Sequence, residues 1–197
     1  MTRTIRILAM AAALLAGAAA LAAIAIVLWP RGGEVAISPS AVGGPFSLTD
    51  QNGRRVTEAD FRGKPVLVFF GFTNCPDVCP TALFEMSEVL RRLGPDAEKV
   101  NAIFISVDPA RDTPEKLRDY LQSFHDRISA LTGSQADIDA VTKAYKAYAK
   151  RVPLEGGNYT MDHSAIVYLM DKNGRFVAPF NLKRKPEEAA ADLRKYL

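Results

Sequence analysis

The chain has 197 residues, of which 48% are hydrophobic and 24% charged, and its formal net charge is +3. This composition excludes a disordered tail, a collagen-like repeat and a disulfide-dense mini-protein, and the length suits one domain plus an appendage. Without the first 30 residues, 23 basic side chains remain against 22 acidic ones. Such a nearly equal number of basic and acidic side chains argues against a nucleic-acid partner, because nucleic-acid recognition needs clustered Lys and Arg.

An apolar segment without charged or polar side chains runs from Ile7 to Trp29. As a helix at about 1.5 Å per residue it is long enough to cross the ~30 Å hydrocarbon core of a bilayer. A cleaved signal peptide has a shorter apolar stretch that ends in small residues. We therefore interpret residues 1–30 as an uncleaved signal anchor, a single transmembrane helix. Arg3 and Arg6 precede it and favour a cytoplasmic N-terminus, which predicts an inner (cytoplasmic) membrane protein with its C-terminal domain in the periplasm.

Residues 31–45 are rich in Gly, Ser and Pro and are interpreted as a flexible linker, so that residues 46–197 form the folded domain. Its first elements are a short hairpin, a continuous apolar strand and a helix. The expected ranges are 46–48 and 54–57 for the hairpin, 65–72 for the buried strand and 81–93 for the helix.

A second buried strand is expected at 100–107, followed by a helix from Pro114 to about Phe124 with Thr113 as its N-cap. The later elements are a helix, a hairpin and a final helix. Their expected ranges are 135 to about 148 for the helix, 165–170 and 175–180 for the hairpin strands, and 186 onward for the last helix. Strands and helices that alternate in this order predict an α/β domain, a mixed sheet flanked by helices.

The two cysteines, Cys75 and Cys79, follow the first buried strand in the segment FTNCPDVCPT. Because proline disfavours helix in the residue before it, we expect Cys79 near the N-cap of the next helix, with Pro80 at the first helical position. The positive potential at a helix N-terminus favours a thiolate. We therefore expect Cys79 to lose its proton readily.

Three roles are compatible with this cysteine pair. A stabilising disulfide is one, but a loop this short restricts the unfolded chain by only ~2 kcal/mol. A redox-active pair and a metal-binding pair are the others, and the spacing alone does not distinguish them.

The two histidines differ in their surroundings. His125 lies among polar residues at a helix end and is expected at the solvated surface. His163 lies in a loop just before a buried strand, and nothing local brings it to the cysteines. Of the methionines, Met86 and Met170 are expected in the core, while Met161 stays open as a thioether ligand.

Five ordered segments carry a family resemblance: GGPFSLTD, FRGKPVLVFFGFTNCPDVCPT, ISVDPARDTPEKL, LTG and YTMDHSAIVYLMDKNG. Behind a single N-terminal span, they closely resemble the Sco/SenC family, the copper chaperones of cytochrome c oxidase, over nearly all of residues 43–182. The resemblance implies a thioredoxin-like fold with a peroxiredoxin-like elaboration. It also implies one copper ion per chain, as Cu(I) or Cu(II), bound by Cys75, Cys79 and His163. Asp77 and Asp162 are expected to add negative potential or to orient the imidazole.

The function that this resemblance implies is a membrane-anchored metallochaperone, not an enzyme, that delivers copper to the CuA centre of oxidase subunit II. Other periplasmic copper carriers or thiol reductants are further expected partners. Two thiolates and an imidazole suit Cu(I), but zinc also accepts this ligand set, so the identity of the metal rests on the resemblance.

A thiol-disulfide reductase that keeps the CuA-site cysteines reduced is the alternative, in which Cys75 and Cys79 form a redox disulfide and His163 is dispensable. A peroxidase is disfavoured, because Pro76 stands where peroxiredoxins carry a Thr or Ser three residues before the reactive cysteine.

Overall fold

The computed structural model describes residue 17 and residues 42–197. Apart from residue 17, the expected transmembrane helix lies outside the described residues, as does the expected linker before residue 42. The anchor at 1–30 and the linker at 31–45 stay predictions. Within the described part of the chain, no helix is both long and apolar enough to span a bilayer.

The described residues form strands β1 to β9 and helices α2 to α5. The strands are β1 Ser47–Asp50, β2 Arg55–Thr57, β3 Val66–Gly71, β4 Asn101–Ser106, β5 Ile128–Thr132, β6 Ala149–Pro153, β7 Tyr159–His163, β8 Val167–Met170 and β9 Phe176–Pro179. The α-helices are α2 Val78–Leu93, α3 Pro114–Leu121, α4 Gln135–Ala144 and α5 Pro186–Leu193, and short 3₁₀ helices lie at Glu58–Phe61, Gly94–Lys99, Glu155–Gly157 and Arg194–Tyr196.

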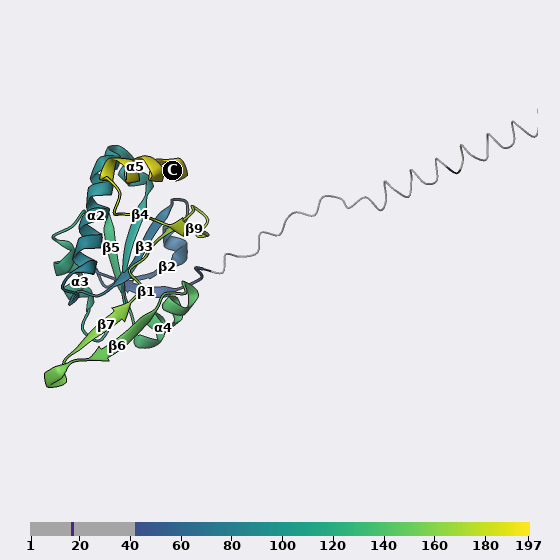
Figure 1. Cartoon of the computed structure of the whole chain (residues 1–197). Helices are drawn as coiled ribbons and strands as arrows, with labels where there is room; N and C mark the ends of the chain where they lie inside the picture. The colour runs from purple at the N-terminus through teal and green to yellow at the C-terminus, as the bar shows by residue number, and fades with distance from the viewer. Residues whose placement is uncertain (1–16, 18–41) are drawn as a thin grey trace, which may run out of the picture. The chain divides into compact units, whose positions relative to one another are not determined.

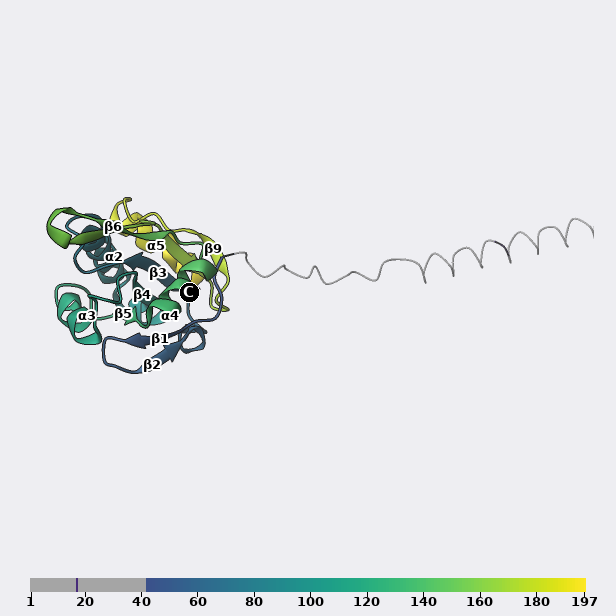
Figure 2. The same ribbon diagram turned by 90° about the horizontal axis from the view of Figure 1, so that it is seen from below.

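Seven strands form one mixed sheet in the order β2-β1-β5-β4-β3-β8-β9. Strands β3, β4 and β5 are parallel, and the other pairs are antiparallel. Helices α2 and α3 lie on one side of this sheet and α4 on the other (Figures 1 and 2). Every residue of β3 is buried, because a central strand covered on both faces has no solvent-facing side. This is the mixed α/β, thioredoxin-like arrangement that the resemblance implied.

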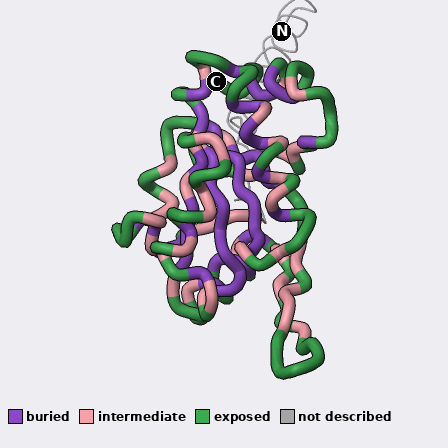
Figure 3. The backbone as a smooth tube through the Cα atoms, turned by 90° about the vertical axis from the view of Figure 1, so that its left-hand side faces the viewer, coloured by how far each residue is buried: buried purple, intermediate pink, exposed green. Residues whose placement is uncertain are grey.

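The central strands form the core, whereas the β6–β7 hairpin lies outside the main sheet. In Figure 3 the central strands are almost wholly buried, and the turn between β6 and β7 is exposed. The largest buried side chains include Phe69, Phe70 and Phe104. Met86 and Met170 are buried among them, which confirms the prediction that both pack in the core.

The sheet topology brings three distant segments to one edge. Gly71 at the end of β3 pairs with Ser106 at the end of β4, so the carboxyl ends of these parallel strands lie side by side. Strand β8 runs the opposite way, and its first residue, Val167, pairs with Phe69. The segments that follow β3 and β4 therefore meet the segment that precedes β8. Open α/β sheets bind ligands at this carboxyl edge.

Several boundaries differ from the sequence-based expectation. Helix α2 begins at Val78 with Asp77 at its N-cap, so Pro80 takes the third helical position rather than the first. A proline fits there because the first-turn N–H groups have no partner within the helix. Helix α4 ends at Ala144, before Lys146 adopts a positive φ of 54°. The N-cap of α3 is confirmed, since the Thr113 side chain accepts a hydrogen bond from the backbone of the first turn.

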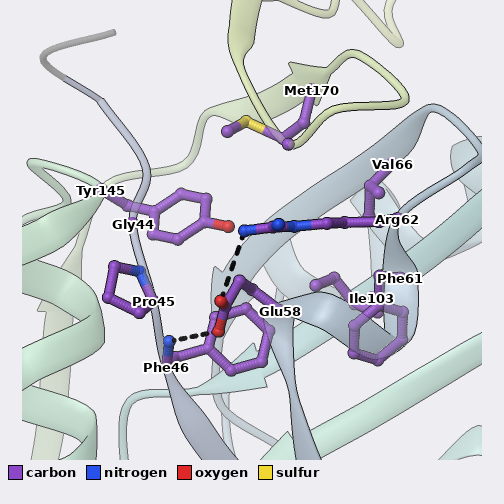
Figure 4. Close-up of a pocket in the computed structure, with 11 residues that line it drawn as sticks. Gly44, Pro45, Phe46, Glu58, Phe61, Arg62, Val66, Ile103, Tyr145 and Met170 are labelled. Atoms are coloured by element: carbon purple, nitrogen blue, oxygen red, sulfur yellow. Dashed lines mark hydrogen bonds and ion pairs between the residues drawn. The ribbon is translucent and has the colours of Figure 1, made fainter. Parts of the chain in front are cut away.

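The described chain enters the domain beside a small cavity of about 110 Å³ (Figure 4). Glu58 accepts a hydrogen bond from the Phe46 backbone N–H at 3.0 Å and pairs with Arg62 at 3.5 Å. Neither cysteine and neither histidine lines this cavity. Its polar groups hold the start of β1 against the 3₁₀ helix that follows β2, and it is not the functional site.

Candidate metal centre

Cys75, Cys79 and His163 lie together, although the histidine is distant from both cysteines in the sequence. One ligand atom from each lies within 4.8 Å of the others. The Cys79 Sγ and His163 Nε2 atoms are 3.4 Å apart, and both thiols are free. The structure thus brings together the three residues that the sequence singled out.

The sulfur of Cys79 occupies a space that a glycine leaves open. The Cys79 side chain is fully buried, and a Cβ added at Gly71 would lie 2.8 Å from its Sγ and 2.7 Å from the Phe104 ring. Real Cβ atoms do not approach other atoms this closely, so any larger residue at position 71 would displace the sulfur. Sequence reasoning missed this residue, and its only signal was a glycine inside an apolar run.

The imidazole of His163 is oriented by backbone and aromatic contacts. Its Nδ1 atom lies 3.2 Å from the Ser164 carbonyl oxygen. Because a carbonyl can only accept, Nδ1 carries the proton and Nε2 keeps a lone pair toward Cys79. The ring also makes edge contacts with Phe69 and Phe72, with centroids 6.2 and 5.7 Å away. Such an arrangement presents Nε2 as a ligand atom.

Burial shifts two of the three ligands, Cys79 and His163, toward their neutral forms. It raises the pKa of the Cys79 thiol, a shift that the hydrogen bond from the Phe72 backbone N–H partly opposes. The expectation that Cys79 deprotonates readily is therefore wrong for the metal-free protein, because loss of solvation outweighs the helix N-terminus. Burial also lowers the pKa of His163. A metal cation that binds here must displace a thiol proton.

The two neighbouring aspartates do not touch the ligands by hydrogen bonds. Asp77 and Asp162 are both exposed, and the Asp77 side chain makes no capping bond to α2. The charge of Asp162 raises the pKa of His163, in opposition to burial. The group that orients the imidazole is the Ser164 carbonyl, so the roles expected for both aspartates stay predictions.

His125 and Met161 lie outside the cluster. His125 is partly buried, and its Nδ1 accepts the Arg127 backbone N–H at 3.2 Å. The expectation of a solvated surface histidine is therefore wrong, and burial lowers its pKa. Met161 is partly buried and packs against the core, which favours a packing role.

The cluster has the geometry of a tetrahedral metal site, and its ligands have the softness that suits copper. Metal bonds of about 2.0 Å to nitrogen and 2.3 Å to sulfur, meeting at a tetrahedral angle, leave the two ligand atoms about 3.5 Å apart. The observed separation of Cys79 Sγ and His163 Nε2, 3.4 Å, is close to this value. Two cysteine thiolates and one neutral imidazole are soft ligands suited to Cu(I), and three protein ligands leave a position open.

A groove of about 460 Å³ is lined by sequence neighbours of the ligands, although no ligand itself lines it. Its lining includes Val78, between the two cysteines and just before Cys79, and Ile166, three residues after His163. Both side chains are among the exposed large hydrophobics, at 44% and 43%. The residues next to Cys79 and His163 in the sequence thus contribute to a concave, partly apolar surface, while the Cys79 sulfur itself is buried.

Comparison with protein families gives one match that spans the whole domain. Residues 34–197 match the family model described as SCO1/SenC.

Individual relatives agree with this match. A SCO2-like protein of Rickettsia prowazekii is 42% identical over 149 residues, which is 75% of this chain and 73% of the relative. The structure of Bradyrhizobium japonicum ScoI with copper bound is 63% identical with a TM-score of 0.78, and the match covers 79% of this chain and 99% of that one. BsSco, described with a disulfide switch and as a member of the Sco family of cytochrome c oxidase assembly proteins, is 26% identical with a TM-score of 0.62, over 81% and 95% of the chains.

Proposed function

The chain belongs to the SCO1/SenC family, and we propose that it is a copper metallochaperone for the assembly of cytochrome c oxidase. It binds one copper ion between Cys75, Cys79 and His163. The observation that carries this proposal is the convergence of the three ligand atoms to within 4.8 Å. Copper in the related Bradyrhizobium structure and the description of BsSco as an assembly protein support it.

Copper leaves this site by ligand exchange. An acceptor thiolate enters the open position before His163 dissociates, and the two cysteine sulfurs then release the ion. The Cys79 thiol regains its proton on return to the metal-free state, because burial favours its neutral form. The acceptor in this proposal is the CuA centre of oxidase subunit II, a site that itself requires thiolate ligands.

The proposal places the domain on the outer side of the inner membrane. Residues 1–30 anchor the chain and residues 31–45 link the anchor to the domain, because the segment 7–29 has no charged or polar side chain and Arg3 and Arg6 precede it. After alkaline extraction the full chain should stay in the membrane fraction. Protease added to spheroplasts should remove the domain, and protection of the domain would contradict this orientation.

A thiol-disulfide reductase is the second candidate, and the two free thiols beside one another favour it. In that reaction Cys75 and Cys79 form a disulfide, and an acceptor disulfide becomes two thiols. Two electrons and two protons pass to the acceptor. The imidazole of His163 takes no part in this exchange, which makes His163 the residue that separates the two functions.

The test of the proposal is competition for Cu(I) between a chelator and the reduced full chain. We expect one copper per chain, no stable binding in Cys75→Ser or Cys79→Ser, and severely weakened binding in His163→Ala. His125→Ala is the matched control and should bind like the parent. Equal copper affinity in His163→Ala and the parent would contradict the proposed site.

Oxidase assembly at low copper separates the two functions. A strain that carries His163→Ala should fail to assemble the oxidase if copper delivery is the function. Normal assembly in that strain, together with failure of the cysteine variants, would favour the reductase.

A further inference from the structure

The loop of residues 108–112, within the ISVDPARDTPEKL segment, follows β4 and contains no ligand of the proposed site. Its polar side chains nevertheless contact both the segment before Cys75 and the hairpin that ends at His163. We propose that this loop, called the bridging loop below, positions the cysteine segment and the histidine hairpin relative to one another. The inference rests on the proposed function for what is bound, but it concerns how the ligands are held.

On the cysteine side, the contact is made by Asp112, whose carboxylate is fully buried. It accepts hydrogen bonds from the Thr73 backbone N–H at 3.0 Å and from the Thr73 hydroxyl at 2.6 Å. Thr73 lies two residues before Cys75. Lys116 approaches Asp112 at 3.9 Å and donates to the Asn74 side chain at 2.6 Å. A buried carboxylate with several donors is a strong and directional acceptor. Asp112 therefore fixes the position of Thr73 and, with it, of the segment that leads to Cys75.

On the histidine side, the contact is made by Asp108 and Arg111. Asp108 is 3% exposed and accepts a hydrogen bond from the Tyr159 hydroxyl at 2.7 Å. Arg111 pairs with Asp108 and donates to the Tyr159 carbonyl at 2.9 Å. Tyr159 is the first residue of β7, and His163 is the last.

The ring of Tyr159 is also held between two guanidinium groups. The Arg111 and Arg151 guanidinium carbons lie 3.7 and 3.6 Å from the ring centroid. Two groups this close to one centroid must occupy opposite faces of the ring, and each makes a cation–π contact. Arg111 also lies 5.9 Å from the Phe72 ring, which itself contacts the imidazole of His163. Strand β7 is thereby held at both ends, at Tyr159 and at His163.

The two sides are joined through Ser106, the last residue of β4, and through the backbone of the bridging loop. The Ser106 hydroxyl donates to Asp112 at 2.6 Å and accepts the Asp108 backbone N–H at 3.1 Å. The backbone N–H groups of Arg111 and Asp112 both donate to the Asp108 carbonyl, at 3.1 and 2.9 Å. A shift of either carboxylate therefore moves the other. Because β6 and β7 form a separate two-stranded sheet, the position of His163 depends on contacts of this kind.

Two hydroxyl deletions test the bridging loop without emptying the core. Tyr159→Phe removes the bond to Asp108, and Thr73→Val removes the hydroxyl bond to Asp112. Tyr148→Phe is the matched control, because Tyr148 is 50% exposed and its hydrogen bonds among the described residues, both to Ser164, are made by its backbone. All variants are made in the full chain.

The first readout is copper binding. Each deletion should lower the Cu(I) affinity about tenfold, at the lower end of the range for groups that orient ligands, while one copper per chain is still bound. The double variant should lose less than the product of the single losses, because both changes act on one connected unit. Tyr148→Phe should bind like the parent.

The second readout is amide hydrogen exchange in the reduced, metal-free chain. Thr73→Val lies on the cysteine side, yet we expect it to accelerate exchange in β7, as Tyr159→Phe does. A merely local role for Thr73 would leave β7 unchanged. If Tyr159→Phe fails to fold, Thr73→Val carries the test alone, since its effect is read at the distant strand.

The proposal is overturned if Thr73→Val changes neither the copper affinity nor the amide exchange in β7, like the control Tyr148→Phe. It is also overturned if the loss of affinity in the double variant equals the product of the two single losses. A parent chain that binds no copper would instead refute the proposed function. The exchange readout would still decide whether the bridging loop couples the two segments.

Discussion

The two sulfurs of the cluster lie in different environments. Cys79 is fully buried and Cys75 is only partly buried. Burial raises the pKa of the Cys79 thiol and lowers that of the His163 imidazole. Cys79 and His163 are therefore both held in their neutral forms in the metal-free protein, which avoids the cost of an isolated buried charge. A metal cation that binds here supplies the positive charge that balances the negative charge of the deprotonated sulfur.

The pKa of His163 gives the metal-free protein a defined pH dependence. The folded pKa lies below the usual 6.5, so the unfolded chain binds the proton first as the pH falls. Stability is therefore present above pH 6.5 and is lost progressively as the pH falls from 6.5 toward the folded pKa. His125 contributes with the same sign.

Urea unfolding of the reduced, metal-free chain at pH 7.5 and pH 5.5 measures this effect. We expect a lower free energy of unfolding at pH 5.5, with a smaller difference in His163→Gln and in His125→Gln. The pKa values of the Asp50 and Asp137 carboxyls are lowered from 3.8, so these two groups do not contribute in this range. A parent that becomes more stable on acidification would contradict the assignment of neutral, buried imidazoles.

Gly71 is predicted to be required for the position of Cys79. In Gly71→Ala, the new Cβ would meet the Cys79 sulfur at 2.8 Å and Phe104 at 2.7 Å. We expect a loss of about 1–3 kcal/mol in the free energy of unfolding, as for overpacked cores, together with weaker copper binding. Gly44→Ala is the control, since its Cβ meets only Ala144 at 3.3 Å. Unchanged copper affinity in Gly71→Ala would show that the sulfur position is not constrained in this way.

At the scale of elements, the sequence predicts the buried strands β3 and β4 and both terminal hairpins of the sheet, but it misses the interior strand β5 and the β6–β7 hairpin. The apolar runs at β3 and β4 identify buried strands because both faces of these strands are covered. Strand β6, in contrast, carries Lys150 and Arg151 and has no buried residue. Such a strand has neither an apolar run nor a buried face to reveal it. The sequence therefore predicts no strand at β6 and places His163 in a loop, whereas the structure has it at the end of β7.

Helix ends are predicted where a side chain caps them. Thr113 before Pro114 marks the start of α3 correctly, because its side chain supplies an acceptor for the first turn. At α2, the Asp77 side chain makes no cap bond, and the helix begins three residues earlier than expected. The position of Cys79 in the first turn follows from burial of its sulfur in the core rather than from a capping signal.

The capping box of α4 allows stability to be changed without touching the site. The Ser134 side chain accepts from the Asp137 backbone N–H, and the Asp137 carboxylate accepts from the Ser134 backbone N–H in return. Ser134→Ala should lower the free energy of unfolding by about 1 kcal/mol and leave the copper affinity unchanged. Ser123→Ala, at an exposed position, is the matched control. A loss of copper affinity in Ser134→Ala would show that the site depends on overall stability.

At the scale of the whole domain, the order and direction of the strands bring the ligands of the site together. Parallel strands β3 and β4 end at the edge where antiparallel β8 begins, so the cysteine and histidine segments meet there. Neither composition nor spacing reveals this meeting, because the pairing of β3 with β8 is a long-range contact. The resemblance of five segments to a known family supplied the ligand set, and the structure supplies the physical reason for it.

Copper should stabilise the whole domain because it binds the folded chain at ligands that unfolding separates. At a free copper concentration of about 100 times the Kd, the expected gain is about 2.7 kcal/mol in the free energy of unfolding. Thermal unfolding of the reduced chain should show a higher midpoint with Cu(I), and a chelator should reverse it. A midpoint that copper raises equally in His163→Ala would mean that the imidazole does not hold the ion.

X-ray absorption spectroscopy of the full chain loaded with one Cu(I) tests the ligand set most directly. We predict a copper ion bound by two sulfurs and one imidazole nitrogen, with the imidazole signal absent from His163→Ala and retained in His125→Ala. A copper environment with sulfur ligands alone, identical in the parent and in His163→Ala, would contradict the proposed site.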